Sequence, residues 1–274
     1  MGDFFMYYVE ENDKQSKIAK LLKAVKVEDD KILLPVQGEE LSIIYQQKLA
    51  KKTYKILQNT NSNKVVLSKK INNYEYFKNY LYSENIEIVS GKWFFKVMIP
   101  NILDYVIEKN NLKKQEIEIS LLLNDLTSIE IEQIEEFANE YKRINIVTNH
   151  IEKFKKLEQK ISKELGIIIV VSNNKKKSLL KSQIIVNYDF PNELVNKFYI
   201  YDEAFIIDSY GDIKINSKRF NGKIINDFKI NIDENEKYNA NQLYEAKFFK
   251  KQSFEYVKKK IEEDEVKIID CWKV

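Results

Sequence analysis

The sequence is poor in the residues that form metal centres and disulfide bonds. Its 274 residues include one cysteine, Cys271, and one histidine, His150. A single cysteine excludes an intramolecular disulfide, and together with one histidine it excludes the usual zinc-binding sets. We therefore predict no metal site, and the composition fits a reducing cytoplasm.

Long apolar runs and an excess of one charge are also missing. No run of about 18 apolar residues occurs, so no membrane span is predicted. The first residues lack the basic and apolar segments of a secretion signal, and the acidic Glu10 and Glu11 follow soon. The chain has 45 basic and 42 acidic residues, a net charge of +3, and lysine and glutamate are mixed along it. Neither a membrane nor a nucleic acid is expected as a partner.

Glycine is scarce, with 6 in the whole chain, and it is missing from a turn where a nucleotide-binding fold needs it. Four apolar, β-branched runs alternate with amphipathic segments of helical length, and they lie at 117–123, 144–147, 167–171 and 184–186. Strands that are apolar on both faces are typical of a parallel sheet covered by helices. This pattern predicts a Rossmann-like unit, whose first strand-to-helix turn, residues 123–128, contains no glycine.

Two helices of this unit have recognisable ends. The first opens at Thr127, and Glu130 follows three residues later, which is the spacing of a capping box. The second runs from His150 to Leu165 and is predicted to end at Gly166, because glycine readily adopts the left-handed conformation that closes a helix.

A smaller α/β unit is predicted upstream, with strands at 32–36, 65–67 and 86–89 separated by helices at 41–57 and 74–82. Short strands joined by helical crossovers indicate a second parallel sheet. The apolar segment 92–109 is predicted as one long helix that joins the two units, with Pro100 introducing a kink or restart. A partner-binding helix is the alternative interpretation of this segment.

The predicted fold class is therefore α/β, with two three-layer, parallel-sheet units joined by a long apolar helix. The predicted domains are a small α/β domain with its connecting helix at 1–110, a Rossmann-like domain at 111–235, and a helical tail at 236–274 that folds back onto the first domain. Residues 205–208 and 213–215 are expected to form a hairpin or strand pair. Residues 266–274 are expected to form an edge strand or a docking segment.

This order of elements resembles the shikimate-dehydrogenase-like two-domain oxidoreductases. The resemblance implies NAD(P) as a cofactor, bound at a glycine-rich turn after the first strand, where this sequence has Asn124-Asp125-Leu126-Thr127. It also implies an Asn-Arg-Thr-like stretch after the second strand, where this sequence has Thr148-Asn149-His150, so only the asparagine matches.

The missing glycines disfavour the usual dinucleotide pose. Micromolar binding corresponds to about 8 kcal/mol, and a charge-assisted hydrogen bond from an amide to phosphate contributes roughly 1.5–3 kcal/mol. Losing two or three such bonds removes most of the affinity, and the carboxylate of Asp125 would repel a pyrophosphate. A single anion could still bind the amides near Thr127 and Ser128 at the helix start.

Polar residues follow four successive strands of the Rossmann-like unit, at the end where open α/β sheets bind ligands. The candidate ligand-binding residues are Asn124, Asp125, Thr127, Ser128, Asn149, His150, Ser172, Asn173, Asn187 and Asp189. They either line one crevice or only cap helices and make turns. His150 could act as a general acid or base, although a lone histidine at a helix start is more often a surface residue.

No catalytic set is recognised, so the leading hypothesis is a cytoplasmic, non-catalytic protein. Its degenerate Rossmann-like core would serve protein interaction or the sensing of a small ligand, without a cofactor. The alternative is a divergent NAD(P)-dependent oxidoreductase with a remodelled phosphate-binding turn. The expected partner is a protein or a small molecule, and the chain could also form a homo-oligomer.

Overall fold

The computed structural model describes residues 6–12, 24–36, 41–167, 169–211, 213–233, 235–248 and 252–272. The chain divides into two compact units. The first comprises residues 1–94 and 232–249, and the second comprises residues 95–231 and 250–274. The sequence predicts domain boundaries at residues 110 and 235. In the structure the chain passes from the first unit to the second after residue 94, and the predicted tail, residues 236–274, is divided between the two units.

The first unit contains a five-stranded sheet in the order β2-β3-β1-β4-β5. Its strands are β1 (Tyr7–Glu11), β2 (Lys26–Glu28), β3 (Lys31–Leu34), β4 (Lys64–Leu67) and β5 (Glu87–Val89). The pairs β3-β1, β1-β4 and β4-β5 are parallel, and β2 is an antiparallel edge strand. The predicted parallel sheet is thus confirmed, while its central strand, β1, was not predicted.

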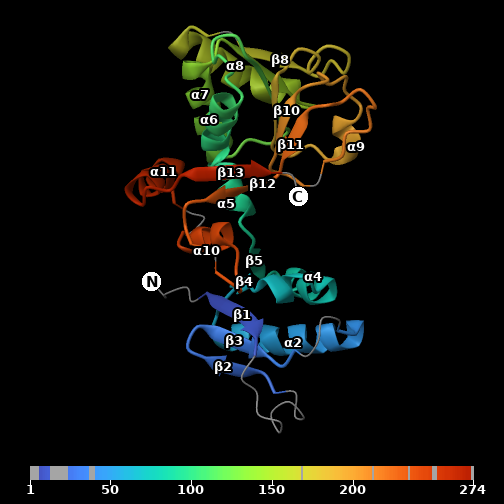
Figure 1. Ribbon diagram of the computed structural model, residues 1–274, viewed down its shortest axis with the longest axis vertical. Coiled ribbons are helices and arrows are strands. Elements are labelled where there is room, and N and C mark those ends of the chain that lie inside the picture. The colour runs from blue at the N-terminus through green and yellow to red at the C-terminus, as the bar shows by residue number, and fades with distance from the viewer. Residues whose placement is uncertain are drawn as a thin grey trace. The chain divides into compact units, whose positions relative to one another are not determined.

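Helices cover both faces of this sheet. They are α2 (Ile43–Asn59), α3 (Lys69–Asn72), α4 (Glu75–Ser83) and α10 (Ala240–Ala246). The helices α2 and α4 lie side by side (Figure 1), and their buried residues share one core with Val65 and Leu67 of β4. Val66 packs on the other face with Leu243 and Ala246 of α10, because alternate residues of a strand point to opposite faces.

The second unit contains a six-stranded sheet in which every pairing is parallel. Its strands are β6 (Glu118–Leu122), β7 (Arg143–Val147), β8 (Ile169–Ser172), β9 (Ile184–Asn187), β10 (Phe205–Asp208) and β11 (Lys223–Ile225). The spatial order is β8-β7-β6-β9-β10-β11. Numbered within the unit, this is 3-2-1-4-5-6, the order of the Rossmann fold. The Rossmann-like prediction is confirmed.

The helices of the second unit are α6 (Ile99–Lys109), α7 (Ser128–Glu140), α8 (Ile151–Leu165), α9 (Asn192–Val195) and α11 (Phe254–Glu263). The predicted end of α8 is confirmed, because Gly166 caps this helix with a φ of 68°. The predicted long helix over 92–109 is interrupted, as the predicted restart near Pro100 allows. It is two helices, α5 (Lys92–Val97) and α6, separated at Met98. Pro100 lies in the first turn of α6, where its missing N–H is tolerated.

The expected strand at 205–208 is β10, but its expected pairing with 213–215 is wrong, because 213–215 is not a strand and β10 pairs in parallel with β11. Residues after β10 turn around the buried carboxylate of Asp208 instead, which accepts bonds from the amides of Tyr210, Gly211 and Ile213. The expected strand near the C-terminus is β13 (Ile268–Trp272), which pairs antiparallel with β12 (Asp227–Ile230). None of the helices in the described part of the chain has the length and apolar character that a membrane span requires.

Candidate functional site

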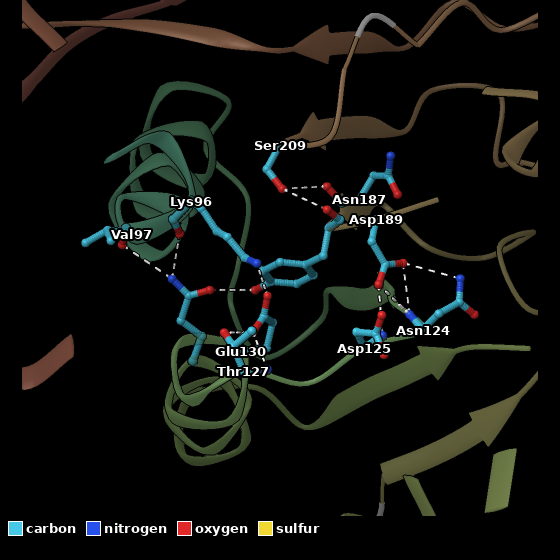
Figure 2. Close-up of polar contacts among 11 residues, drawn as sticks. Lys96, Val97, Asn124, Asp125, Thr127, Glu130, Asn187, Asp189 and Ser209 are labelled. Carbon is cyan, nitrogen blue, oxygen red and sulfur yellow. Dashed lines mark hydrogen bonds and ion pairs between the residues drawn. The ribbon is translucent and has the colours of Figure 1, made fainter. Parts of the chain in front are cut away.

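The first strand-to-helix turn of the Rossmann-like unit is occupied by a carboxylate of the chain itself. The backbone amide of Asn124 donates to both carboxylate oxygens of Asp189, at 2.9 and 2.8 Å. The amide of Asp125 donates to the same carboxylate at 2.9 Å. Figure 2 shows the Asp189 side chain directed at these two residues. In a dinucleotide-binding protein, the amides of this turn bind the pyrophosphate of the cofactor. Here the carboxylate of Asp189 takes the place of the pyrophosphate.

The end of β9 sets the position of Asp189. Asn187 ends the strand and closes a tight turn, because its side chain donates to the carbonyl of Phe190 and accepts from its amide, both at 2.9 Å. The amide of Tyr188 donates to the carbonyl of Leu122 in β6 at 3.0 Å. The parallel pairing of β6 and β9 is thereby extended, which brings the next residue, Asp189, beside Asn124.

A second internal carboxylate occupies the start of α7. Glu130 accepts a bond from the Thr127 amide at 2.7 Å, as the predicted capping box requires, and another from the Thr127 hydroxyl. Glu130 also pairs with the ammonium group of Lys96. The residue is only 2% exposed. Burial alone would raise the pKa of Glu130, but the bonds from Lys96 and Thr127 lower it below its ordinary value.

Tyr188 connects the end of β9 to α7, and through α7 to α5. Its hydroxyl donates to the side-chain carbonyl of Gln133 at 2.7 Å. The amide group of Gln133 in turn donates to the backbone carbonyls of Lys96 and Val97, at 2.8 and 3.3 Å. Burial raises the pKa of the Tyr188 phenol well above its ordinary value, so this hydroxyl remains a neutral donor. These buried side-chain bonds fix α5, α7 and the end of β9 to one another within the second unit.

The first and second strand-to-helix turns are also bonded together. The side-chain oxygen of Asn124 accepts from the amide of Asn149 at 2.9 Å. Lys153 pairs with Asp125 at 2.6 Å and donates to the carbonyl of Asn124 at 3.3 Å. An open depression of about 570 Å³ lies beside this contact, lined by Asp125, Asn149, His150, Ile151, Glu152 and Lys153.

Of the remaining predicted residues, His150 lines the depression just described, and the others form separate local groups. Ser172 accepts from the amide of Asn174 and from the hydroxyl of Ser178, and Asn173 is exposed beside it. His150 is exposed, and its amide donates to Thr148. Ser128 is the exposed first residue of α7. The structure thus brings Asn124, Asp125, Asn149 and Asp189 together, and ligand binding by any of the ten stays a prediction.

Asp208 was not among the predicted site residues. Its position at the end of the apolar strand β10 is visible in the sequence and could have indicated it. It lies beside Asn187, whose side chain donates to it at 2.9 Å. Burial raises the pKa of Asp208, against the lowering effect of its hydrogen bonds. Burial likewise raises the pKa of Asp189, although the amides of Asn124 and Asp125 act in the other direction. Both carboxylates are committed to neighbouring amides rather than to an open cleft.

The strand order and the crossover helices define a Rossmann-like α/β protein. Among known proteins, similarity is found only to solved structures. No protein-family model matches the chain. The curated proteins contain no match either.

Similar solved structures include a tryptophan dehydrogenase from Nostoc punctiforme, with 7% identity over 78% of this chain and a TM-score of 0.36. This chain covers 65% of that protein, slightly less than two thirds. Shikimate 5-dehydrogenase from Listeria monocytogenes shows 10% identity over 76% of this chain and 79% of its own, with a TM-score of 0.28. Aspartate transcarbamoylase from Trypanosoma cruzi shows 12% identity over 75% and 71%, with a TM-score of 0.30. These scores are low, so the fold is assigned from the strand order, and none of these activities is carried over to this chain.

Proposed function

We propose that the protein is a non-catalytic binding protein, which uses its Rossmann-like unit as a scaffold for a small ligand or another protein. The observation that supports this is the Asp189 carboxylate on the amides of Asn124 and Asp125. A dinucleotide in the usual pose would have to displace this carboxylate and lie beside a second one, Asp125. The residues of the turn therefore do not fit a pyrophosphate.

One observation favours the alternative, an NAD(P)-dependent oxidoreductase. The order β8-β7-β6-β9-β10-β11 is that of dinucleotide-binding folds. Such an enzyme would need a cofactor pose that avoids the occupied amides, which makes direct binding measurements the deciding experiment.

Thermal unfolding of the intact chain with NAD(H) and NADP(H) tests the proposal. We expect no saturable rise in melting temperature, because a ligand stabilises a protein only when it binds the folded state. A saturable rise with either dinucleotide would overturn the proposal in favour of the oxidoreductase.

Two variants test the physical reason. Asp189→Ala frees both amides, so we expect pyrophosphate to raise the melting temperature of this variant. Asp125→Ala is the matched control, since it removes one negative charge from the same turn and leaves the amides bonded to Asp189. Equal responses of the two variants to pyrophosphate would show that charge, rather than occupation of the amides, closes the turn.

A further inference from the structure

A cavity of about 610 Å³ lies in the second unit, at the amino ends of β10 and β11. The turns described above follow the carboxyl ends of the strands, so this cavity is at the opposite edge of the sheet. Its volume lies within the roughly 300–1,000 Å³ range of small-molecule sites. Its lining includes Tyr105, Lys109, Phe205, Phe220, Lys223 and Asp270.

The lining of the cavity combines polar side chains with an apolar part. Val106, Ile224 and Ile225 are buried and form an aliphatic floor. Phe205 and Phe220 line the cavity and are only partly buried, so their rings are available to a ligand. Burial, together with Asp270 and Asp227, raises the pKa of the Cys271 thiol to about 12, which keeps this group uncharged as well. The Phe205 and Phe220 rings of this lining favour a flat molecule with an apolar body.

Two ammonium groups lie beside aromatic rings of this lining. Lys109 lies 5.5 Å from the centre of the Tyr105 ring, and Lys223 lies 5.7 Å from the centre of the Phe205 ring. Both lysines are exposed. Within the described part of the chain, neither ammonium group has a carboxylate within ion-pair distance. They are therefore available to an anion held over the aromatic rings.

The single carboxylate of the lining is already engaged. One oxygen of Asp270 accepts from the Tyr105 hydroxyl at 3.3 Å and from the amide of Cys271 at 2.9 Å. The lining therefore contains two ammonium groups, those of Lys109 and Lys223, together with the hydrogen-bonded carboxylate of Asp270 and the aromatic rings. This combination selects for a molecule with an apolar body and one negative group.

We propose that this cavity binds a small aromatic carboxylate, with the ring against Phe205 and Phe220 and the carboxylate at Lys109 and Lys223. The site rests on the proposed function and names a ligand class for it, and it does not depend on whether a dinucleotide binds at the first turn. Its ligand and its residues differ from those of the dinucleotide experiment, so the two proposals can fail separately.

Fluorescence titration of the intact protein with anilinonaphthalene sulfonate, an aromatic anion, tests the site. We expect saturable binding to one site, and we expect naphthoate to displace the probe while neutral naphthalene methanol does not. In the double variant Lys109→Met/Lys223→Met, the Kd should rise about tenfold, the effect of two partly exposed charge contacts. Both side chains are exposed, so the variant should keep its melting temperature.

The matched control is Lys175→Met/Lys176→Met, which removes the same charge from two exposed lysines away from the cavity. Its Kd for the probe should equal that of the unchanged protein. Absence of saturable binding, or equal affinities of the two double variants, would overturn the proposal.

Discussion

Glu130 carries its carboxylate in surroundings where it is 2% exposed, with Lys96 and Thr127 as partners. A buried charge is stable only when its partners replace the water that it has lost. The bonds from Lys96 and Thr127 hold the pKa of Glu130 below its ordinary value of 4.5, even though burial acts in the opposite direction. The ionised form of this residue therefore stabilises the folded state.

We predict that Glu130→Gln lowers the free energy of unfolding by about 2 kcal/mol at neutral pH, because hydrogen bonds to a charged group contribute roughly 1.5–3 kcal/mol. A lowered folded-state pKa gives stability that is present above the unfolded-state pKa and is lost as the pH falls through the folded-state pKa. The difference between the two proteins should thus shrink below about pH 4.5. Urea unfolding at a series of pH values measures it.

Glu152→Gln provides the control, because the Glu152 side chain is 82% exposed in its pair with Lys155. Exposed pairs contribute little, so this variant should unfold like the original protein at every pH. A difference for Glu130→Gln that stays constant down to acidic pH would contradict the assigned role of the charge.

Part of the candidate site could be predicted from neighbouring residues alone. The capping box of Thr127 and Glu130 is a local pattern, and the structure confirms it. Asp189 as the partner of Asn124 could not be predicted, because the two are 65 residues apart in the sequence. Their contact depends on the register that aligns Leu122 with Asn187, and register is a property of the assembled sheet.

At the scale of elements, Gly222 determines how the chain enters β11. A Cβ atom at this position would lie 2.1 Å from the backbone carbonyl oxygen of Ala204 and 2.6 Å from the ring of Phe220. The backbone of Ala204 cannot move easily, because its carbonyl also accepts from the amide of Lys223 at 3.0 Å. Only glycine therefore fits between β10 and β11 at this point.

We predict that Gly222→Ala lowers the free energy of unfolding by about 2–3 kcal/mol, the usual effect of overpacking. Gly211→Ala is the control, since a Cβ atom there meets no other atom within 4 Å. Chemical denaturation of both variants measures the difference. If Gly222→Ala were as stable as Gly211→Ala, the tight approach at Ala204 would be refuted.

The elements that the sequence did not predict have physical explanations. Strand β1 reads Tyr7-Tyr8-Val9-Glu10-Glu11, which looks too polar for a central strand. Glu10 is nevertheless buried, since Lys31, Lys237 and the hydroxyl of Tyr238 lie within bonding distance of its carboxylate. Partners that are distant in the sequence thus compensate the buried charge of Glu10, whereas the local sequence pattern predicts that this residue is exposed. The strands β6, β7, β8 and β9 of the Rossmann-like unit needed no such partners, and these four were predicted, whereas the short strand β11 was not.

At the scale of the whole molecule, neither unit is a continuous piece of chain, because residues 232–249 belong with 1–94. Gln242 of α10 shows how this returning segment is held. Its side-chain amide donates to the carbonyls of Leu67 in β4 and Val89 in β5, at 3.1 and 2.8 Å. This segment was expected to return to the first domain, but its separation from residues 250–274 was not foreseen.

We predict that Gln242→Ala destabilises the first unit by about 1–3 kcal/mol, because it leaves two strand carbonyls without this donor. Hydrogen exchange followed by mass spectrometry should show faster exchange in β4 and β5, while β6 and β9 keep their protection. Gln58→Ala, at an exposed position of α2, should change neither. Equal loss of protection in both units would contradict a local effect.

The divided first unit has a consequence for biosynthesis. Val66 and Val89 are covered in part by Tyr238, Leu243 and Ala246, which the ribosome adds only after it has made residues 95–231. At typical translation speeds this interval is on the order of ten seconds. We therefore expect this sheet face of the nascent first unit to be incompletely covered during that time, which would make it a surface for chaperones to bind.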